Sequence, residues 1–285
     1  MSRLSLRSPA KLNLALRIIH KRPDGFHRLQ TLFERIDLCD RLELTLNRSG
    51  RIRLICEEPG LRRAKRNLVY RAAVMLQQRF RIKMGVDIQL IKNIPLAAGL
   101  GGGSSNAATA LKGLNRLWRL GLSAEDLNAC GQALGSDVPF FLHNSSWALG
   151  TGRGDIIKPL VIDTKIWHVL VVPRTKIYSR EVFTRVNLQL TKTTANVNIL
   201  IRSLRNNTIY NNSESIYNDL EDAIIKTCPR LFSVKNRLSG FFPSKVIFSG
   251  SGPAVFGIVS SKKSAVRLAD KLRRFYSRVF VVRTF

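Results

Sequence analysis

The sequence is short of cysteine, and its cysteines lack the spacing of a metal site or of a disulfide framework. Four cysteines, at positions 39, 56, 130 and 228, are spread over 285 residues, with no Cys-x-x-Cys pair and no histidine at ligand spacing. Zinc sites and small secreted domains both need cysteines in close, regular groups. We therefore expect reduced thiols in a cytoplasmic protein, and we assign no metal-ligating residue.

Long apolar runs are also lacking. The longest stretches without a charged residue, 93–111 and 246–261, are interrupted by Gly, Ser and Pro, whereas a membrane span needs about 20 consecutive apolar residues. Near the N-terminus, Arg3, Arg7 and Lys11 break up the apolar core that a secretory signal requires. We expect no membrane partner and no signal peptide.

Acidic side chains are scarce, with 19 against 47 basic ones and a net charge of +28. Such an excess suits either a polyanion-binding protein or a basic surface facing anionic metabolites. The charge is not concentrated in one domain, because it is +13 over residues 1–92, +1 over 93–160 and +14 over 161–285. The densest cluster, residues 62–66, is short and lies beside no zinc-finger or aromatic RNA-binding signature. We expect no dedicated nucleic-acid partner.

The remaining composition is that of a globular protein, with 45% hydrophobic and 23% charged residues. A length of 285 residues corresponds to one large domain or two ordinary ones. Alternating apolar residues predict strands at 12–18, 42–46, 52–54 and 86–91, and an apolar run predicts another at 167–172. Strands are also predicted at 245–248, 254–259 and 278–284. Helices are predicted at 67–80, 104–119, 262–275 and over most of 178–240. This mixture predicts an α+β protein with an N-terminal domain at 1–158 and a C-terminal domain at 159–285.

Capping residues mark where three of the helices begin. Asn67 precedes the first, and Ser123 with Asp126 forms a capping box before another. The helix after the glycine-rich stretch is expected to open at Ser104, Ser105 and Asn106.

A glycine-rich loop carries the strongest chemical signal. Its glycines permit left-handed dihedrals and close backbone approach, and its N–H groups, together with the N-terminus of the following helix, can bind an anion. Asn106 replaces the third glycine of a dinucleotide fingerprint, and no Gly-Lys-Ser/Thr closes a Walker A loop. We predict a phosphate-binding loop. Its residues are Pro95, Leu96, Ala97, Ala98, Gly99, Leu100, Gly101, Gly102, Gly103, Ser104 and Ser105.

Three further segments have two interpretations each. Asp137, in a Gly/Pro-containing turn, is either a turn-former or a catalytic carboxylate. Lys11 and Asn13 share one face of a strand, which is either functional or a solvated edge. The glycine turn at 249–253 either completes a phosphate site or is only a hairpin.

Together these segments resemble the GHMP small-molecule kinases. The loop 95–105 resembles the second motif of that family, and Ser8–Asn13 and Ser249–Pro253 are similar to the first and third, in the right order. Segments 22–27, 134–141 and 218–221 resemble the members that act on 4-diphosphocytidyl-2-C-methyl-D-erythritol. The resemblance covers about residues 5–284. It implies a ribosomal-protein-S5-like N-terminal domain and a ferredoxin-like C-terminal domain.

The resemblance also implies an activity, the ATP-dependent phosphorylation of the 2-hydroxyl of that substrate. Lys11 and Asp137 match the catalytic pair of the family, and the loop 95–105 matches its ATP-binding segment. Asn13, Phe26, His27 and Phe183 match substrate-binding positions, with the two phenylalanines stacking on cytosine. Mg²⁺ is expected to accompany the nucleotide, in a monomer or homodimer.

Two alternatives compete with this interpretation. A GHMP kinase acting on homoserine or mevalonate would not need the aromatic–histidine pair at 26–27, because those substrates have no base to stack. A polyanion-binding protein with an inactive kinase fold would not need Lys11, Asp137 and the intact loop. The chain also departs from the family: Phe26 replaces a common tyrosine, and Ala97 and Ala98 stand where glycine is common.

Overall fold

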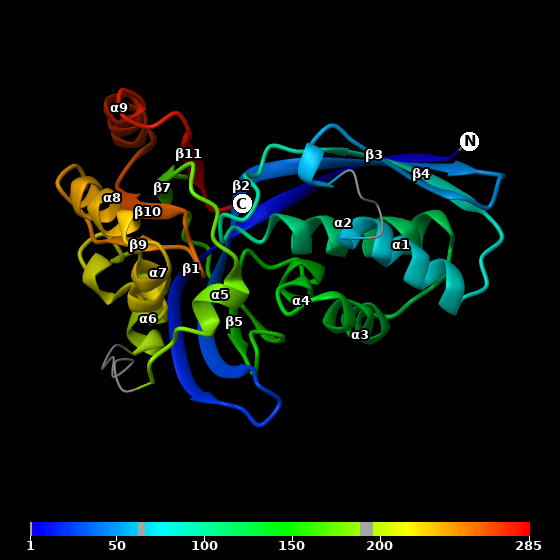
Figure 1. Ribbon diagram of the computed structural model, residues 1–285, viewed down its shortest axis with the longest axis horizontal. Helices are drawn as coiled ribbons and strands as arrows, with labels where there is room; N and C mark the ends of the chain where they lie inside the picture. Colours follow the sequence, from blue (N-terminus) through cyan, green and yellow to red (C-terminus); the bar gives the residue numbers. More distant parts are fainter. Residues whose placement is uncertain (1, 62–65, 189–195) are drawn as a thin grey trace. The chain divides into compact units, whose positions relative to one another are not determined.

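The computed structural model describes residues 2–61, 66–188 and 196–285, which form two compact units (Figure 1). The first unit combines Met1–Ala10, Leu38–Ile94 and Gly101–Asn144, and the second combines Lys11–Asp37, Pro95–Leu100 and Ser145–Phe285. Most of the basic cluster at 62–66 lies outside the described residues. The division into domains at residue 158 stays a prediction.

Two long strands, β1 (Arg3–Lys21) and β2 (His27–Asn47), contribute residues to both units. The predicted strands at 12–18 and 42–46 are short parts of them. The alternating pattern could not show their length, because every residue from Ser8 to Leu16 is buried and burial on both faces removes the polar alternation.

The first unit contains a sheet whose strands run in the order β3 (Ile52–Cys56), β4 (Gly85–Ile91), β2 and β1. Strand β4 pairs parallel with β3 and antiparallel with β2, in the register that sets Leu44 opposite Ile88. A 3₁₀ turn, η1 (Pro59–Leu61), follows β3. The helices of this unit are α1 (Leu68–Arg79), α2 (Gly102–Leu117), α3 (Ala124–Leu134) and α4 (Val138–Leu142). Helix α2 contacts the other three, and α1 contacts β3.

Helix starts follow the predicted caps in two of three cases. Asn67 Oδ1 accepts a hydrogen bond from Val69 N at 2.9 Å, and Ser123 forms the predicted capping box with Asp126. The prediction for α2 was wrong, because the helix begins at Gly102 rather than at Ser104. Gly101 takes the cap position in a left-handed conformation with φ +67° and caps without a side chain, which glycine adopts at little cost.

The second unit contributes further strands to the long ones and builds a separate antiparallel sheet. Strand β5 (Trp147–Thr151) pairs with β2 and with β6 (Ile156–Leu160), and β8 (Tyr217–Asn218) pairs parallel with β1. The separate sheet has the order β11 (Val279–Arg283), β7 (Trp167–Val171), β10 (Val255–Val259) and β9 (Val246–Phe248).

Helices cover the strands of the second unit. They are α5 (Ser179–Phe183), α6 (Val197–Arg205), α7 (Glu221–Thr227), α8 (Arg230–Ser239) and α9 (Lys262–Arg273), with a 3₁₀ turn η3 (Ser213–Ser215). Helix α9 packs on β7 and β11. The predicted helical stretch 178–240 is mainly helical where the structure describes it, and its residues 189–195 lie outside the described part. The predicted mixture of helix and strand is therefore confirmed.

A buried polar group ties the C-terminal residues into this unit. Glu34 Oε2 lies 2.8 Å from His168 Nε2, and Glu34 Oε1 accepts a hydrogen bond from the Thr284 hydroxyl at 2.7 Å. The hydroxyl in turn accepts from Ile166 N at 2.9 Å.

Among the helices of the described residues, none is both long and apolar enough to cross a bilayer.

Asp219 gives the second unit a pH-dependent stability. Its carboxylate accepts a hydrogen bond from Ile18 N at 2.9 Å, but burial raises the pKa of Asp219 from 3.8 to about 6. Because the folded-state pKa lies above the unfolded value, the folded chain holds a proton that the unfolded chain releases. The contribution of Asp219 to the free energy of unfolding is therefore favourable at low pH and is lost as pH rises through about 6.

We expect Asp219→Asn, which keeps a hydrogen-bond acceptor, to raise the free energy of unfolding at pH 8 by about 1 kcal/mol. The full pKa shift would give about 3 kcal/mol, and partial exposure of the carboxylate reduces it. At pH 4 the gain should nearly vanish, because both folded forms are then neutral. Urea unfolding of both proteins at the two pH values measures this, and an equal gain at both would contradict it.

Candidate functional site

Three of the predicted motifs meet in the second unit. The backbone N–H of Lys11, on β1, donates to Leu100 O of the glycine-rich loop at 3.0 Å. The hydroxyl of Ser249, in the turn after β9, donates to Gly99 O of the same loop at 3.0 Å. The strand, the loop and the turn are therefore joined by direct hydrogen bonds, although they lie far apart in the sequence.

Glycine is required where the loop and the turn approach each other. Gly99 has φ +74°, and a Cβ atom there would lie 2.1 Å from Ser249 O. Gly250 has φ +52°, and its Cβ would lie 3.0 Å from both Lys11 Nζ and Asn13 Oδ1. The turn is thus more than a hairpin, because it packs against the loop and against the polar side chains of β1.

Asn218, on β8, holds the same turn through hydrogen bonds. Its Nδ2 donates to Phe248 O at 2.9 Å and to Gly250 O at 2.7 Å, while its Oδ1 accepts from Leu220 N at 3.0 Å. This segment was part of the sequence resemblance without an assigned role. The contacts show a clamp on the turn that faces Lys11.

Lys11 and Asn13 form a buried polar pair. Their exposed fractions are 3% and 2%, which excludes a solvated strand edge. Lys11 Nζ donates to Asn13 Oδ1 at 2.5 Å, and Asn13 Nδ2 donates to the Thr31 hydroxyl at 2.7 Å. The hydroxyl donates onward to Ala15 O at 2.7 Å. This chain of contacts fixes the Asn13 amide and therefore the direction of the Lys11 ammonium.

In the first unit, a buried carboxylate holds the segment that leads into the loop. Asp40 Oδ1 accepts hydrogen bonds from Asn93 N at 2.7 Å and Ile94 N at 2.8 Å. Its Oδ2 pairs with Lys92 and accepts from Asn106 Nδ2, on α2, at 2.9 Å. Asp40 and Lys92 are not among the predicted site residues, because their pairing joins positions 52 residues apart.

Asp137 lies between α3 and α4 and is half-buried. Helix α3 ends at Leu134, and Pro139 restricts the first turn of α4. The side chain of Asp137 makes no capping hydrogen bond to α4. A capping role therefore does not support the interpretation of Asp137 as a turn-former. Asp137 belongs to the first unit and Lys11 to the second, and their pairing stays a prediction.

Two of the predicted base-binding residues, His27 and Phe183, lie together in the second unit. The ring of His27 is buried and lies 5.6 Å from the ring of Phe183, at an angle of 30°. Phe183 ends α5 and packs partly on the core. Burial, and to a smaller degree the charge of Lys21, lower the pKa of His27 from 6.5. The lowered pKa favours the neutral imidazole, which can both donate and accept a hydrogen bond.

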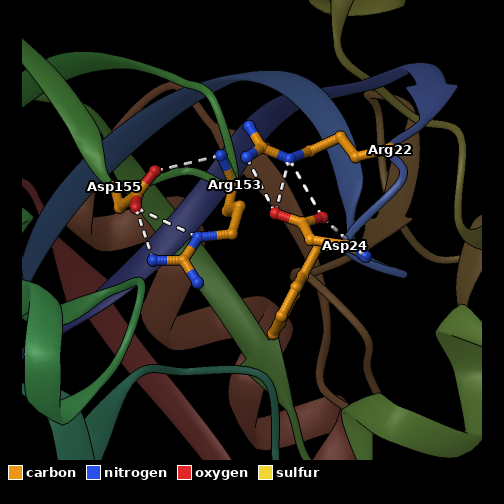
Figure 2. A network of polar contacts seen from close by, with 5 residues as sticks. Arg22, Asp24, Arg153 and Asp155 are labelled. Carbon is orange, nitrogen blue, oxygen red and sulfur yellow. Dashed lines mark hydrogen bonds and ion pairs between the residues drawn. The ribbon is translucent and has the colours of Figure 1, made fainter.

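Phe26 is 54% exposed, and its N–H donates to Asp24 Oδ1 at 3.1 Å. Asp24 belongs to a network of charged side chains with Arg22, Arg153 and Asp155 (Figure 2). The guanidinium of Arg153 lies 4.9 Å from the centre of the Phe26 ring. Arg153 pairs with Asp155 at 2.9 Å, and Arg22 pairs with Asp24 at 2.8 Å. Arg153 was not a predicted site residue, because its contact with Phe26 joins two turns far apart in the sequence.

Comparison with known proteins gives a family and close relatives. The descriptions "GHMP kinases N terminal domain" and "GHMP kinases C terminal" match residues 67–145 and 200–278. The 4-diphosphocytidyl-2-C-methyl-D-erythritol kinase of Geobacillus kaustophilus is 39% identical over 283 residues, 99% of this chain and 97% of the relative. The protein of the same name from Exiguobacterium sibiricum is 40% identical over 278 residues, 98% and 96% of the two chains. A crystal structure of 4-(cytidine 5'-diphospho)-2C-methyl-D-erythritol kinase matches with a TM-score of 0.86 and 31% identity, covering 99% of this chain and all of that one.

The loop contains one strained residue that tests its geometry. Ala97 has φ +49°, whereas the neighbouring Ala98 has no positive φ. A left-handed conformation costs a non-glycine residue about 1–2 kcal/mol, and added flexibility from glycine costs about 0.5–1 kcal/mol. We expect Ala97→Gly to raise the free energy of unfolding by up to about 1 kcal/mol, and Ala98→Gly to lower it by about 0.5–1 kcal/mol. Denaturant unfolding of both variants measures this, and equal losses would show that Ala97 is unstrained.

Proposed function

This chain belongs to the GHMP kinases, and we propose that it transfers the γ-phosphoryl group of ATP to the 2-hydroxyl of 4-diphosphocytidyl-2-C-methyl-D-erythritol. That reaction is a step of the non-mevalonate route to isoprenoid precursors. The observation that carries the proposal is the contact between the rings of His27 and Phe183, with the exposed Phe26 next to His27 in the sequence, because aromatic rings of this kind can stack on a base. Relatives that cover nearly the whole chain bear the name of that kinase, which supports it.

The glycine-rich loop, residues 95–105, is proposed to bind the β- and γ-phosphates of ATP. This role rests on the backbone geometry of the loop, which has little room for side chains at two of its glycines. A Cβ atom at Gly99 would lie 2.1 Å from Ser249 O, and one at Gly102 would lie 3.0 Å from Ile94. The 16-residue helix α2 begins inside the loop, so its free N–H groups and positive dipole end are available to an anion. The buried hydroxyl of Ser105 has no hydrogen-bond partner among the described residues.

Mg²⁺ is proposed to accompany the nucleotide and, when bound, to neutralise charge on its phosphates. Among the described residues, no group of three His, Cys, Asp or Glu side chains is placed to hold a metal ion. Because Mg²⁺ in kinases is commonly bound through substrate phosphates and water, we assign no protein ligand to it.

Asp137 is proposed as the general base and Lys11 as its partner. As the bond between the 2-hydroxyl oxygen and phosphorus forms, the hydroxyl proton passes to the Asp137 carboxylate and ADP leaves with the electron pair of the broken bond. Asn13 holds Lys11 through a 2.5 Å hydrogen bond, and the role proposed for this ammonium is to favour the ionised carboxylate and to orient the hydroxyl. The transfer step needs few other catalytic groups, because phosphoryl transfer depends mainly on positioning and electrostatics.

The cytosine is proposed to stack between Phe26 and Phe183 and to hydrogen-bond the neutral His27. Phenylalanine at position 26 keeps the stacking face of tyrosine but has no hydroxyl. Homoserine and mevalonate have no base, so neither would use this pocket. The proposal also includes a cytoplasmic monomer or homodimer with domains at 1–158 and 159–285 and without a dedicated nucleic-acid partner.

A substrate panel tests the proposed function. ADP release is measured with ATP and, in turn, the diphosphocytidyl substrate, homoserine and mevalonate. We expect turnover with the first alone. Turnover only with homoserine or mevalonate would replace the substrate assignment, and no turnover with any of the three would favour the polyanion-binding alternative.

Asp137→Asn tests the base. The variant keeps the shape of the side chain but loses its charge and proton acceptor, so we expect kcat to fall by about 10²–10⁴-fold with little change in the KM for ATP. Asp163→Asn, at an exposed aspartate, is the matched control. A folded Asp137→Asn variant that keeps more than about half of the wild-type rate would show that the base lies elsewhere.

Phe183→Ala tests the base-binding pocket. Stacking of a base on an aromatic ring contributes about 1–3 kcal/mol, so binding of the cytidyl substrate should weaken by about 5- to 150-fold while ATP binding stays nearly unchanged. Phe232→Ala, at a phenylalanine of α8 that is exposed, should leave both unchanged. If Phe183→Ala weakened the binding of the cytidyl substrate and of ATP equally, Phe183 would be a core residue rather than a pocket residue.

A further inference from the structure

We propose that Arg153 is a positioning residue for cytidine recognition, because its guanidinium supports one face of Phe26 and leaves the other face to the base. The inference rests on the proposed function, since it assumes that Phe26 stacks on the substrate. It adds a residue from the turn between β5 and β6 to a pocket otherwise built from the segment after β1 and from α5.

Arg153 is itself held in place. Its backbone N–H donates to Asp155 Oδ1 at 3.0 Å, and its Nε and Nη2 donate to Asp155 Oδ2 at 3.2 and 2.9 Å. The flanking Gly152 and Gly154 both have positive φ, at +68° and +90°. Gly152 O accepts from Leu29 N, on β2, at 2.8 Å. The turn is thus anchored to the strand that begins directly after Phe26.

Phe26 is fixed through its backbone but not through burial of its ring. Its carbonyl accepts from Arg22 N at 2.7 Å, and its N–H donates to Asp24 Oδ1 at 3.1 Å. The Asp24 carboxylate is held by the Arg22 side chain at 2.8 Å. The ring, however, is 54% exposed, and ordering an exposed ring at the moment of binding weakens affinity. A planar group on one face reduces that loss.

Arginine suits this task better than other cations. A guanidinium is planar, stacks on aromatic faces and pairs with a carboxylate through two N–H groups, whereas a lysine ammonium does none of these in the same way. The 4.9 Å between guanidinium and ring centre is within the range of a cation–π contact. Because Phe26 has no hydroxyl, this face contact takes the place of a polar anchor on the ring.

Arg153 also carries a charge that would attract an anionic diphosphate at a distance, so the test must separate stacking from charge. The variants are Arg153→Met, which removes both, and Arg153→Lys, which keeps the charge. Each is made in the wild-type protein and in Phe26→Ala. The control is Arg283→Met, because Arg283 also lies over a ring, that of Trp167 at 5.7 Å, and also pairs with an aspartate, Asp37 at 3.7 Å.

We expect Arg153→Met to raise the KM for the diphosphocytidyl substrate by about 3- to 30-fold, the range of a cation–π contact, with kcat and the KM for ATP changed less than twofold. Arg153→Lys should reverse less than half of the rise in KM that Arg153→Met causes. In Phe26→Ala, the same substitution should change the KM by less than twofold, because the ring through which Arg153 acts is gone. Arg283→Met should match the wild type.

Three results would overturn the inference while the proposed function stands, provided that the wild-type enzyme turns over the diphosphocytidyl substrate. These are an unchanged KM in Arg153→Met, full restoration by Arg153→Lys, and an equal effect of Arg153→Met with and without Phe26. The second would assign Arg153 to charge attraction, and the third to a contact made independently of Phe26. If the wild-type enzyme does not turn over this substrate, the proposed function fails, and the inference fails with it. Thermal unfolding of each variant confirms that the comparison is made between folded proteins.

Discussion

The close approach between Gly99 and the carbonyl of Ser249 is the contact around which the second unit is organised. A Cβ atom at position 99 would lie 2.1 Å from that oxygen, so the loop and the turn can meet only through a glycine. Their meeting brings the turn against Lys11 and Asn13, and the backbone of Lys11 is hydrogen-bonded to the next loop residue, Leu100. One absent side chain thus permits a strand, a loop and a turn to pack together.

Three cations of this chain are held in place by neighbouring side chains, and this matters more for binding than the number of cations. The chain has a net charge of +28, which alone would attract any anion weakly and in a salt-dependent way. Lys11 is fixed by Asn13 and Arg153 by Asp155, and Lys92, in the first unit, is paired with Asp40. Side chains held in this way lose little freedom on binding a ligand, and such preorganisation favours specificity.

Features that depend on neighbouring residues could be predicted from the sequence. The cap at Asn67, the capping box at Ser123 and the glycine-rich loop are local, and each follows from a few consecutive residues. The start of α2 could not be placed, because a left-handed Gly101 competes with serine as a cap and the sequence does not show which prevails. The support of Phe26 by Arg153 was missed for a different reason: it depends on how the strands between the two turns pair, which local patterns do not encode.

We propose that the approach of Gly99 to the turn sets the conformation of the loop at residues 95–105, the proposed phosphate-binding segment. Gly99→Ala and Gly121→Ala test it most directly, because both glycines have positive φ, +74° and +65°, but only Gly99 has an atom within 4 Å of its added Cβ. The measurement is kcat/KM for ATP at saturating diphosphocytidyl substrate, with thermal unfolding to show that both variants are folded. We predict a loss of about 10²-fold for Gly99→Ala, the effect of moving a reacting group by about 1 Å, and less than threefold for Gly121→Ala. Equal losses would show that backbone strain alone was measured, and that the contact with Ser249 does not position the loop.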